Sequence, residues 1–238
     1  MPSANHPAKS FTIRINHNKA VCSKCIPPFS YTMQKYLVAI LMCLFLFLTI
    51  GCKRQQVNPH SDVDSLLVHL KEGDLLFRRG TGFVGHVVTM ADTEGRYSHV
   101  GIVVCKDSVP YIVHAVPHEH DFEGDFDRVK CEDARSFIGR YTECVAGIYR
   151  PQVSDSLKSI AANHALRLSE KQIPFDHDYN LDDTTALYCT ELIEYVYGLV
   201  GISISEGRRT NVSLPGMRGE YIMPSDLTKC SKLEEITF

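Results

Sequence analysis

Cys189 is the residue of this chain best placed to act as a nucleophile. It follows a run of helix-capping residues, Asp182 to Thr185, and lies near the start of a segment with helical spacing that ends before Gly201. Unpaired backbone N–H groups and the helix dipole favour a thiolate in the first turn of a helix. Cys189 also lies on the apolar stripe with Leu192 and Val196. A buried structural thiol is therefore the alternative interpretation.

Two histidines offer the base that a cysteine nucleophile needs. His99 and His114 lie on two β-branched segments joined by a turn at Lys106 to Ser108. With a two-residue turn that pairs Cys105 with Ser108, the histidines oppose each other directly on one face of an antiparallel pair. His99 is then the general base, and His114 fixes its tautomer. The structural alternative is a pair of partly buried strand histidines that bond to backbone groups.

The composition indicates an ordinary domain without a basic surface for nucleic acid. The chain has 238 residues, 22% of them charged, and a net charge of −3. The basic stretch from Glu206 to Thr210 has no interleaved aromatic residues, so we expect no nucleic-acid partner. Residues His118 to Asp127 concentrate metal-ligand types, but their spacing fits neither an EF-hand nor a zinc protease. We predict no metal and no cofactor, and interpret this run as an acidic rim that could face a cationic substrate group.

The N-terminal part predicts a secretory signal with a lipid attachment site. Leu37 to Ile50 is an apolar run interrupted only by Thr49, and it is shorter than the about 20 residues that span a bilayer. It leads into Leu48 to Cys52, which resembles the lipobox of bacterial lipoproteins, although Thr49 departs from the usual leucine. This resemblance implies lipidation of Cys52 and a membrane-anchored protein of the bacterial cell envelope, on the outer membrane facing the periplasm. An uncleaved anchor or a buried helix is the alternative.

Four segments follow from this interpretation. Residues 1–32 are a polar extension or a start-site artefact, 33–51 the signal peptide, 52–64 a tether and 65–238 a single folded domain. The domain's pattern predicts an α+β fold with one antiparallel sheet packed against helices. The expected strands are 72–77, 97–104, 111–116 and 145–149, with a last one near 221–223; the expected helices are 66–70, 83–92, 156–168 and 185–200; 207–219 is expected to be loop.

Four motifs, occurring together and in order, resemble a known family. They are Gly73 to Phe77, Tyr97 to Gly101, Pro174 to Asp176 and Leu187 to Glu191. The set is similar to the YiiX/YebB-like branch of the NlpC-type, papain-like cysteine hydrolases. That branch is circularly permuted, so that histidine precedes cysteine in the chain. The resemblance covers residues 70–227 and implies a permuted papain-like fold with the nucleophile at a helix N-terminus.

The resemblance also implies roles for individual residues. Cys189 would be the nucleophile and His99 the general base, with His114 as the third polar residue. The Cys189 backbone N–H would stabilise the oxyanion, and Tyr97 and Asp176 would shape the cleft. No cofactor is implied.

The expected activity is hydrolysis of an amide bond through an acyl-thioester, on a peptide substrate such as a cell-wall peptide. Related proteins act on acyl-lipids, so a lipid acyl hydrolase or transferase remains open. A non-catalytic lipoprotein that binds peptide or lipid is a further alternative.

Overall fold

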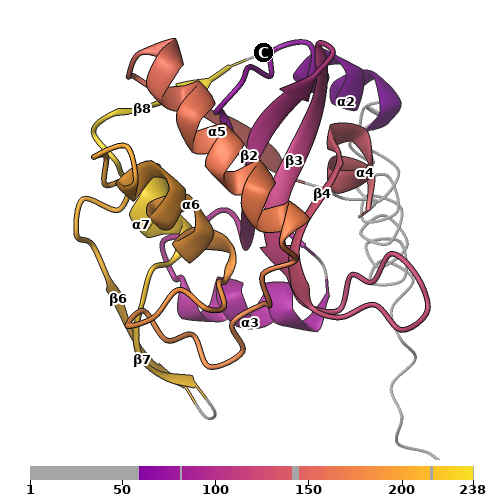
Figure 1. The fold of residues 1–238 in the computed structure, drawn as a ribbon. Coiled ribbons are helices and arrows are strands. Elements are labelled where there is room, and N and C mark those ends of the chain that lie inside the picture. Colours follow the sequence, from indigo (N-terminus) through magenta and orange to yellow (C-terminus); the bar gives the residue numbers. More distant parts are fainter. Residues whose placement is uncertain (1–58, 81, 141–144, 215–216, 238) are drawn as a thin grey trace, which may run out of the picture. The chain divides into compact units, whose positions relative to one another are not determined.

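A six-stranded antiparallel sheet positions the candidate residues. The computed structural model describes residues 59–80, 82–140, 145–214 and 217–237, so the predicted signal peptide and Cys52 lie outside the described residues. The strand order is β4-β3-β2-β1-β5-β8 (Figure 1), which confirms the predicted α+β class with an antiparallel sheet. The strands are β1 (Leu75–Arg78), β2 (His99–Lys106), β3 (Val109–Val116), β4 (Arg128–Asp133), β5 (Ala146–Pro151) and β8 (Leu233–Ile236).

Helices cover both faces of this sheet. Helices α5 (Asp155–Glu170) and α6 (Cys189–Gly198) pack on one face, and α2 (Pro59–Leu67) and α4 (Ala134–Gly139) lie against the other (Figure 1). Within the described residues, no helix is long and apolar enough to span a membrane. The apolar residues of β2 alternate between the two cores. Val100, Ile102 and Val104 join the core beneath α5 and α6, whereas Val103 joins the core with α2 and α4.

A smaller group of elements lies beside the sheet. It consists of α3 (Phe83–Ala91), the hairpin of β6 (Thr210–Leu214) and β7 (Met217–Tyr221), and α7 (Pro224–Thr228). Val212, Tyr221 and Met223 form its buried core, with Val88 of α3 packed against them. The expected loop over 207–219 is therefore wrong for most of its length, since this segment contains a β-hairpin. Its apolar side chains find burial against α3 rather than in the main sheet.

The hairpin between β2 and β3 corrects the predicted register by two residues. Lys106 pairs with Val109, so the turn is formed by Asp107 and Ser108. Both turn residues have positive φ, 50° and 67°, as a type I′ hairpin requires. Continued along the strands, this register places His114 opposite Gly101, so the predicted direct opposition of the two histidines is wrong. Because the shift is an even number of residues, both histidines still lie on one face.

Two further differences concern elements that the sequence analysis did not assign. Strand β4 and helix α4 follow each other, and the Asp133 carboxylate at their junction accepts a hydrogen bond from Ser136 N–H at 2.9 Å. In β4, charged Arg128, Lys130 and Glu132 alternate with less polar residues, which is the period-2 signal of a strand. Helix α2 begins at Pro59, so residues 59–64 of the predicted tether are helical.

Candidate active site

Cys189 is the first residue of α6, which begins later than the predicted start at Thr185. Tyr188 is the N-cap, and its carbonyl accepts the first helical hydrogen bond, from Leu192 N–H at 2.9 Å. The Glu191 carboxylate in turn accepts a hydrogen bond from Tyr188 N–H at 3.2 Å. Since the first N–H groups of a helix have no acceptor within the helix, the Cys189 N–H is available to an oxyanion.

The Cys189 thiol is neutral in this structure. Burial raises its pKa to about 11, although the backbone N–H groups of Val100, Thr190 and Cys189 itself, together with Arg78, act to lower it. The expectation of a thiolate favoured by the helix N-terminus is therefore wrong for the resting protein. The helix contributes in the expected direction, but the desolvation of a charged sulfur outweighs it.

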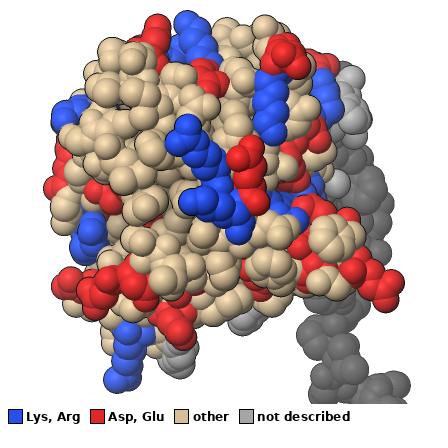
Figure 2. Space-filling view, in the orientation of Figure 1, with Lys and Arg blue, Asp and Glu red and all other residues tan. Residues whose placement is uncertain are grey.

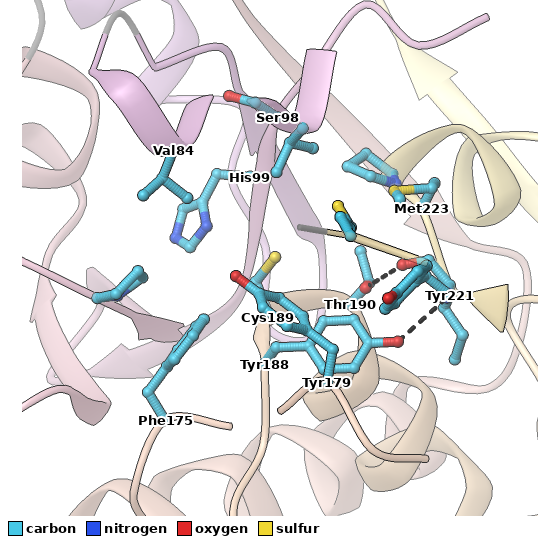
Figure 3. A pocket seen from close by; sticks show the side chains of 15 residues that line it. Val84, Ser98, His99, Phe175, Tyr179, Tyr188, Cys189, Thr190, Tyr221 and Met223 are labelled. Carbon is cyan, nitrogen blue, oxygen red and sulfur yellow. Dashed lines mark hydrogen bonds between the residues drawn. The ribbon is translucent and has the colours of Figure 1, made fainter. Parts of the chain in front are cut away.

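His99 and His114 form a buried pair beside this thiol. His99 lines the same pocket as Cys189 (Figure 3). His99 Nε2 lies 2.9 Å from His114 Nδ1, within hydrogen-bond distance. Burial lowers the pKa of both imidazoles well below 6.5, and the nearby positive charge of Arg78 lowers both further. Both rings are therefore neutral at neutral pH, which is the form that a general base requires.

Glu132 on β4 extends the histidine pair. Its Oε1 lies 3.0 Å from His114 Nε2. The angle at this contact falls outside hydrogen-bond geometry, but a carboxylate oxygen this close favours the tautomer with the His114 proton on Nε2, and we assign Nδ1 as the acceptor on that basis. His99 Nε2 must then donate to His114, which leaves the lone pair of His99 on Nδ1. Glu132 was not among the predicted site residues, because the charged period-2 pattern of β4 was not assigned to a strand.

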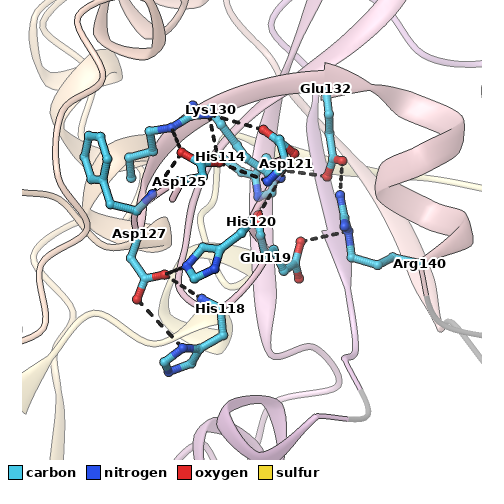
Figure 4. Close-up of polar contacts among 12 residues, drawn as sticks. His114, His118, Glu119, His120, Asp121, Asp125, Asp127, Lys130, Glu132 and Arg140 are labelled. Atoms are coloured by element: carbon cyan, nitrogen blue, oxygen red, sulfur yellow. Dashed lines mark hydrogen bonds and ion pairs between the residues drawn. The ribbon is translucent and has the colours of Figure 1, made fainter. Parts of the chain in front are cut away.

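Beyond Glu132 lies a network of alternating charges (Figure 4). Arg140 forms ion pairs with Glu132 and with Glu119, the latter at 2.9 Å. Glu119 also pairs with Arg78 at 2.6 Å. The Arg78 side chain is 1% exposed, and it donates a further hydrogen bond to the Phe137 carbonyl at 2.7 Å. These contacts neutralise the carboxylates behind His114 and fix Glu132 in place.

His114, Glu119 and Glu132 could by spacing alone hold a metal ion, because their ligand atoms lie within 4.8 Å of one another. The charges do not favour this. Both carboxylates already pair with guanidinium groups, and a divalent cation would have to displace the buried Arg78 or the more exposed Arg140. The cluster fits a role in orienting His114 better than a role as a metal site.

The pocket around Cys189 is apolar and aromatic. Its walls come from α3, from the segment that precedes α6, and from the end of the β6–β7 hairpin. A second, more polar hollow adjoins it and includes Arg78, Gly80 and Glu119. Ser98 and His99 line both, so His99 stands between an apolar and a polar end of one cleft. The apolar end is lined by Val84, Val88, Phe175, Tyr179, Met217 and Tyr221, among others.

Two residues predicted to shape the cleft lie outside the pocket wall. Tyr97 is 2% exposed and packs in the core against Phe77, with ring centroids 5.4 Å apart, so it supports the sheet. The Asp176 carboxylate accepts hydrogen bonds from the N–H groups of Asp178 at 2.8 Å and Asn180 at 2.5 Å. Asp176 thus influences the cleft through the loop that it stabilises.

The acidic run from His118 to Asp127 is largely engaged with basic partners (Figure 4). Asp125 pairs with Arg128 at 2.9 Å, and Asp121 pairs with Lys130 at 2.6 Å. On the face shown in Figure 2, basic and acidic side chains are interspersed. The carboxylates of this run therefore anchor the loop to β4, which leaves less free negative charge than the predicted rim requires.

Comparison with known proteins decides the family. Residues 69–236 match the family described as "Permuted papain-like amidase enzyme, YaeF/YiiX, C92 family". The chain belongs to this family. The resemblance inferred from the four motifs is thereby confirmed, and so is the permuted papain-like fold. The YaeF/YiiX family is one of amidases, so the chain belongs to a hydrolase family.

A solved structure has the same fold. It is titled "Crystal structure of metalloprotein yiiX from Escherichia coli O157:H7", and it is similar to this chain with a TM-score of 0.58 and 18% sequence identity. The match covers 70% of this chain and 96% of that chain. No curated protein matches the sequence.

Proposed function

We propose that this chain is a cysteine amidase in which Cys189, His99 and His114 carry the reaction and Glu132 orients His114. The observation that supports this most directly is the 2.9 Å contact between His99 Nε2 and His114 Nδ1 at the pocket that contains Cys189. Because His99 Nε2 carries the proton in this contact, the free lone pair of His99 is on Nδ1. An oriented imidazole beside a thiol at a helix start is the arrangement that nucleophilic catalysis needs.

The reaction proceeds by general-base catalysis, because both the thiol and the imidazole are neutral at rest. As sulfur attacks the amide carbonyl, His99 Nδ1 takes the thiol proton and the carbonyl oxygen becomes an oxyanion, which the Cys189 N–H stabilises. Collapse breaks the C–N bond, and His99 returns its proton to the leaving amine. Water, deprotonated by His99, then hydrolyses the acyl-thioester, which releases the acid and restores the thiol.

The substrate class that we propose is a peptide amide, including the peptides of the bacterial cell wall. Incubation with muropeptides should release a new amino group and a new carboxyl group. A trapped reaction should show an acyl adduct on the peptide that contains Cys189. Cys189→Ser should abolish both, and retention of hydrolysis in this variant would refute the cysteine mechanism.

A second candidate, hydrolysis or transfer of a lipid acyl group, is favoured by the apolar lining of the pocket. The same residues would form the same thioester, but the acyl group would be a fatty acid. Parallel incubation with diacyl phospholipids distinguishes the two. Release of a fatty acid without cleavage of muropeptides would select the lipid reaction.

We further propose that the enzyme acts in the cell envelope, anchored by a lipid on Cys52. The support is the lipobox-like sequence that ends the apolar run. In membrane fractionation of the full chain, Cys52→Ala should move the protein to the soluble fraction. Unchanged membrane association of this variant would exclude lipidation of Cys52 as the anchor.

A further inference from the structure

The proposed reaction has one hydrogen-bond donor for the oxyanion, the Cys189 N–H, and the inference below rests on that reaction. Tetrahedral intermediates of acyl transfer are generally stabilised by more than one preorganised donor. A second donor must reach the carbonyl oxygen while the carbonyl carbon is bonded to sulfur. It must therefore lie in the same pocket as Cys189 and have a polar hydrogen that no other group accepts.

Tyr179 meets both conditions. It lines the pocket together with Cys189 and His99, and Figure 3 shows its ring crossing the pocket with the hydroxyl end beside Cys189. Among the described residues, the Tyr179 hydroxyl has no hydrogen-bond partner. The neighbouring Tyr188 differs in where its hydroxyl lies, because that oxygen accepts a hydrogen bond from Ile222 N–H at 3.1 Å and points away from Cys189 (Figure 3).

The ring of Tyr179 is fixed by other aromatic rings. Its centroid lies 5.3 Å from that of Tyr188, 5.9 Å from that of Phe175 and 6.0 Å from that of Tyr221. These separations are those of favourable aromatic pairs. A ring packed on three sides presents its hydroxyl in one place, which is the preorganisation that oxyanion stabilisation depends on.

The backbone conformation of Tyr179 also indicates a functional position. Its φ is 53°, in the left-handed region, which is a strained conformation for a bulky residue. The Asp176 carboxylate stabilises this loop conformation by accepting the N–H groups of Asp178 and Asn180. Strain of this kind persists where surrounding contacts fix it, and it is concentrated at functional sites.

We propose that the Tyr179 hydroxyl donates the second hydrogen bond to the oxyanion. The phenol is well suited to donate throughout the neutral range. Burial and, to a smaller extent, the nearby Cys189 sulfur raise its pKa to about 12. The hydroxyl keeps its proton during the reaction and only shares it with the oxyanion, so no net proton transfer to or from Tyr179 occurs.

Tyr179→Phe tests this proposal, because it removes the hydroxyl and keeps the ring packing. The probe is p-nitrophenyl octanoate, whose acylation of Cys189 releases p-nitrophenolate. We expect the acylation rate constant to fall about 10²- to 10³-fold, the usual loss of one oxyanion donor, with KM changed less than twofold. Tyr195→Phe makes the same change on α6 outside the pocket and should match the wild type.

Two further measurements separate oxyanion stabilisation from a structural role. Inhibition by octanal, which forms a tetrahedral adduct with the thiol, should weaken in Tyr179→Phe by a factor similar to the loss in acylation. Alkylation of Cys189 by iodoacetamide forms no oxyanion and should keep its wild-type rate. Equal losses in alkylation and acylation would overturn the proposal in favour of a structural role for the hydroxyl.

Two outcomes distinguish a wrong role for Tyr179 from a wrong cysteine mechanism. If Cys189→Ala abolishes acylation but Tyr179→Phe acylates at the wild-type rate, the role of Tyr179 is wrong and the cysteine mechanism stands. If Cys189→Ala still releases p-nitrophenolate with burst kinetics, the cysteine mechanism itself is wrong.

Discussion

At the scale of single residues, the proposed catalysis depends on orientation rather than on a preformed ion pair. The Cys189 thiol has its pKa raised to about 11 by burial, and His99 has its pKa lowered well below 6.5 by the same cause. Both shifts favour the uncharged forms. The chain from Glu132 through His114 to His99 therefore acts by fixing which nitrogen carries a proton.

The first prediction concerns the titration of Cys189. Iodoacetamide alkylation of the resting enzyme, followed by mass spectrometry of the peptide that contains Cys189, should reach half its maximal rate near pH 11. A free cysteine reaches it near pH 8.5. The cause is the cost of a thiolate in a buried site. A midpoint at or below that of a free thiol would contradict this account of the resting state.

The second prediction concerns Glu132. Glu132→Gln keeps the shape of the side chain but allows the amide to face His114 with either its oxygen or its nitrogen, which weakens the preference for one tautomer. We expect kcat to fall about 10- to 100-fold, as when outer partners of a functional histidine are lost, with KM little changed. Glu234→Gln, on the exposed strand β8, is the control.

At the scale of elements, the sequence was most informative where a segment is long and regular. Helix α3 and the strands β2 and β3 were predicted close to their observed bounds, because their apolar or β-branched residues follow one clear period. Strand β4 was not predicted because its buried face is charged. Lys130 is 2% exposed, and its ammonium group donates hydrogen bonds to the Asp121 carboxylate and the Glu119 carbonyl. Such burial depends on partners that the local sequence does not reveal.

The third prediction tests how closely β2 and β3 approach at the histidines. A Cβ at Gly101 would lie 2.3 Å from Ile112 Cγ2 and 3.0 Å from the Val113 carbonyl oxygen. Gly101→Ala should lower the free energy of unfolding by about 1–3 kcal/mol, the usual cost of overpacking, and reduce activity by displacing His114. Gly198→Ala, whose Cβ meets nothing within 4 Å, should be neutral or stabilising in urea denaturation.

At the scale of the whole domain, the two halves of the candidate active site belong to opposite faces of one sheet. Cys189 opens α6, which packs on the face of Val100, whereas His99 shares its face with Val103. They meet where β2 begins, and there the Val100 N–H lies close enough to the sulfur to lower its pKa. The sequence predicted both residues but not this meeting point, which depends on how α6 docks on the sheet.

The fourth prediction follows from burying two neutral histidines. Since His99 and His114 have folded-state pKa values well below 6.5, the unfolded chain binds protons below pH 6.5 that the folded chain does not. The free energy of unfolding should therefore fall as pH decreases from 6.5, by up to about 1.4 kcal/mol per pH unit for each histidine. Urea denaturation between pH 4.5 and 7 measures this slope.

Glu191 affects the pH dependence of the free energy of unfolding in the opposite direction. The contribution of the two histidines must therefore be isolated with a variant. Burial raises the pKa of Glu191 from 4.5 to about 8, and its contribution to stability is lost as pH rises between these values. A His99→Gln/His114→Gln double variant should show a smaller loss of stability on acidification than the wild type. His86→Gln, on the exposed side of α3, should leave the slope unchanged. Equal slopes in the double variant and the wild type would contradict the buried-histidine account.

The two-residue turn of Asp107 and Ser108 limits how this enzyme can vary in length. Inserting or deleting one residue there would move every side chain of β3 to the other face of the sheet, and His114 would then point away from His99. A change of two residues would preserve the face, although it would shift the pairing along the strand. Natural length variation at this turn in active relatives should therefore occur in even steps, while odd steps should accompany loss of the His99–His114 pair.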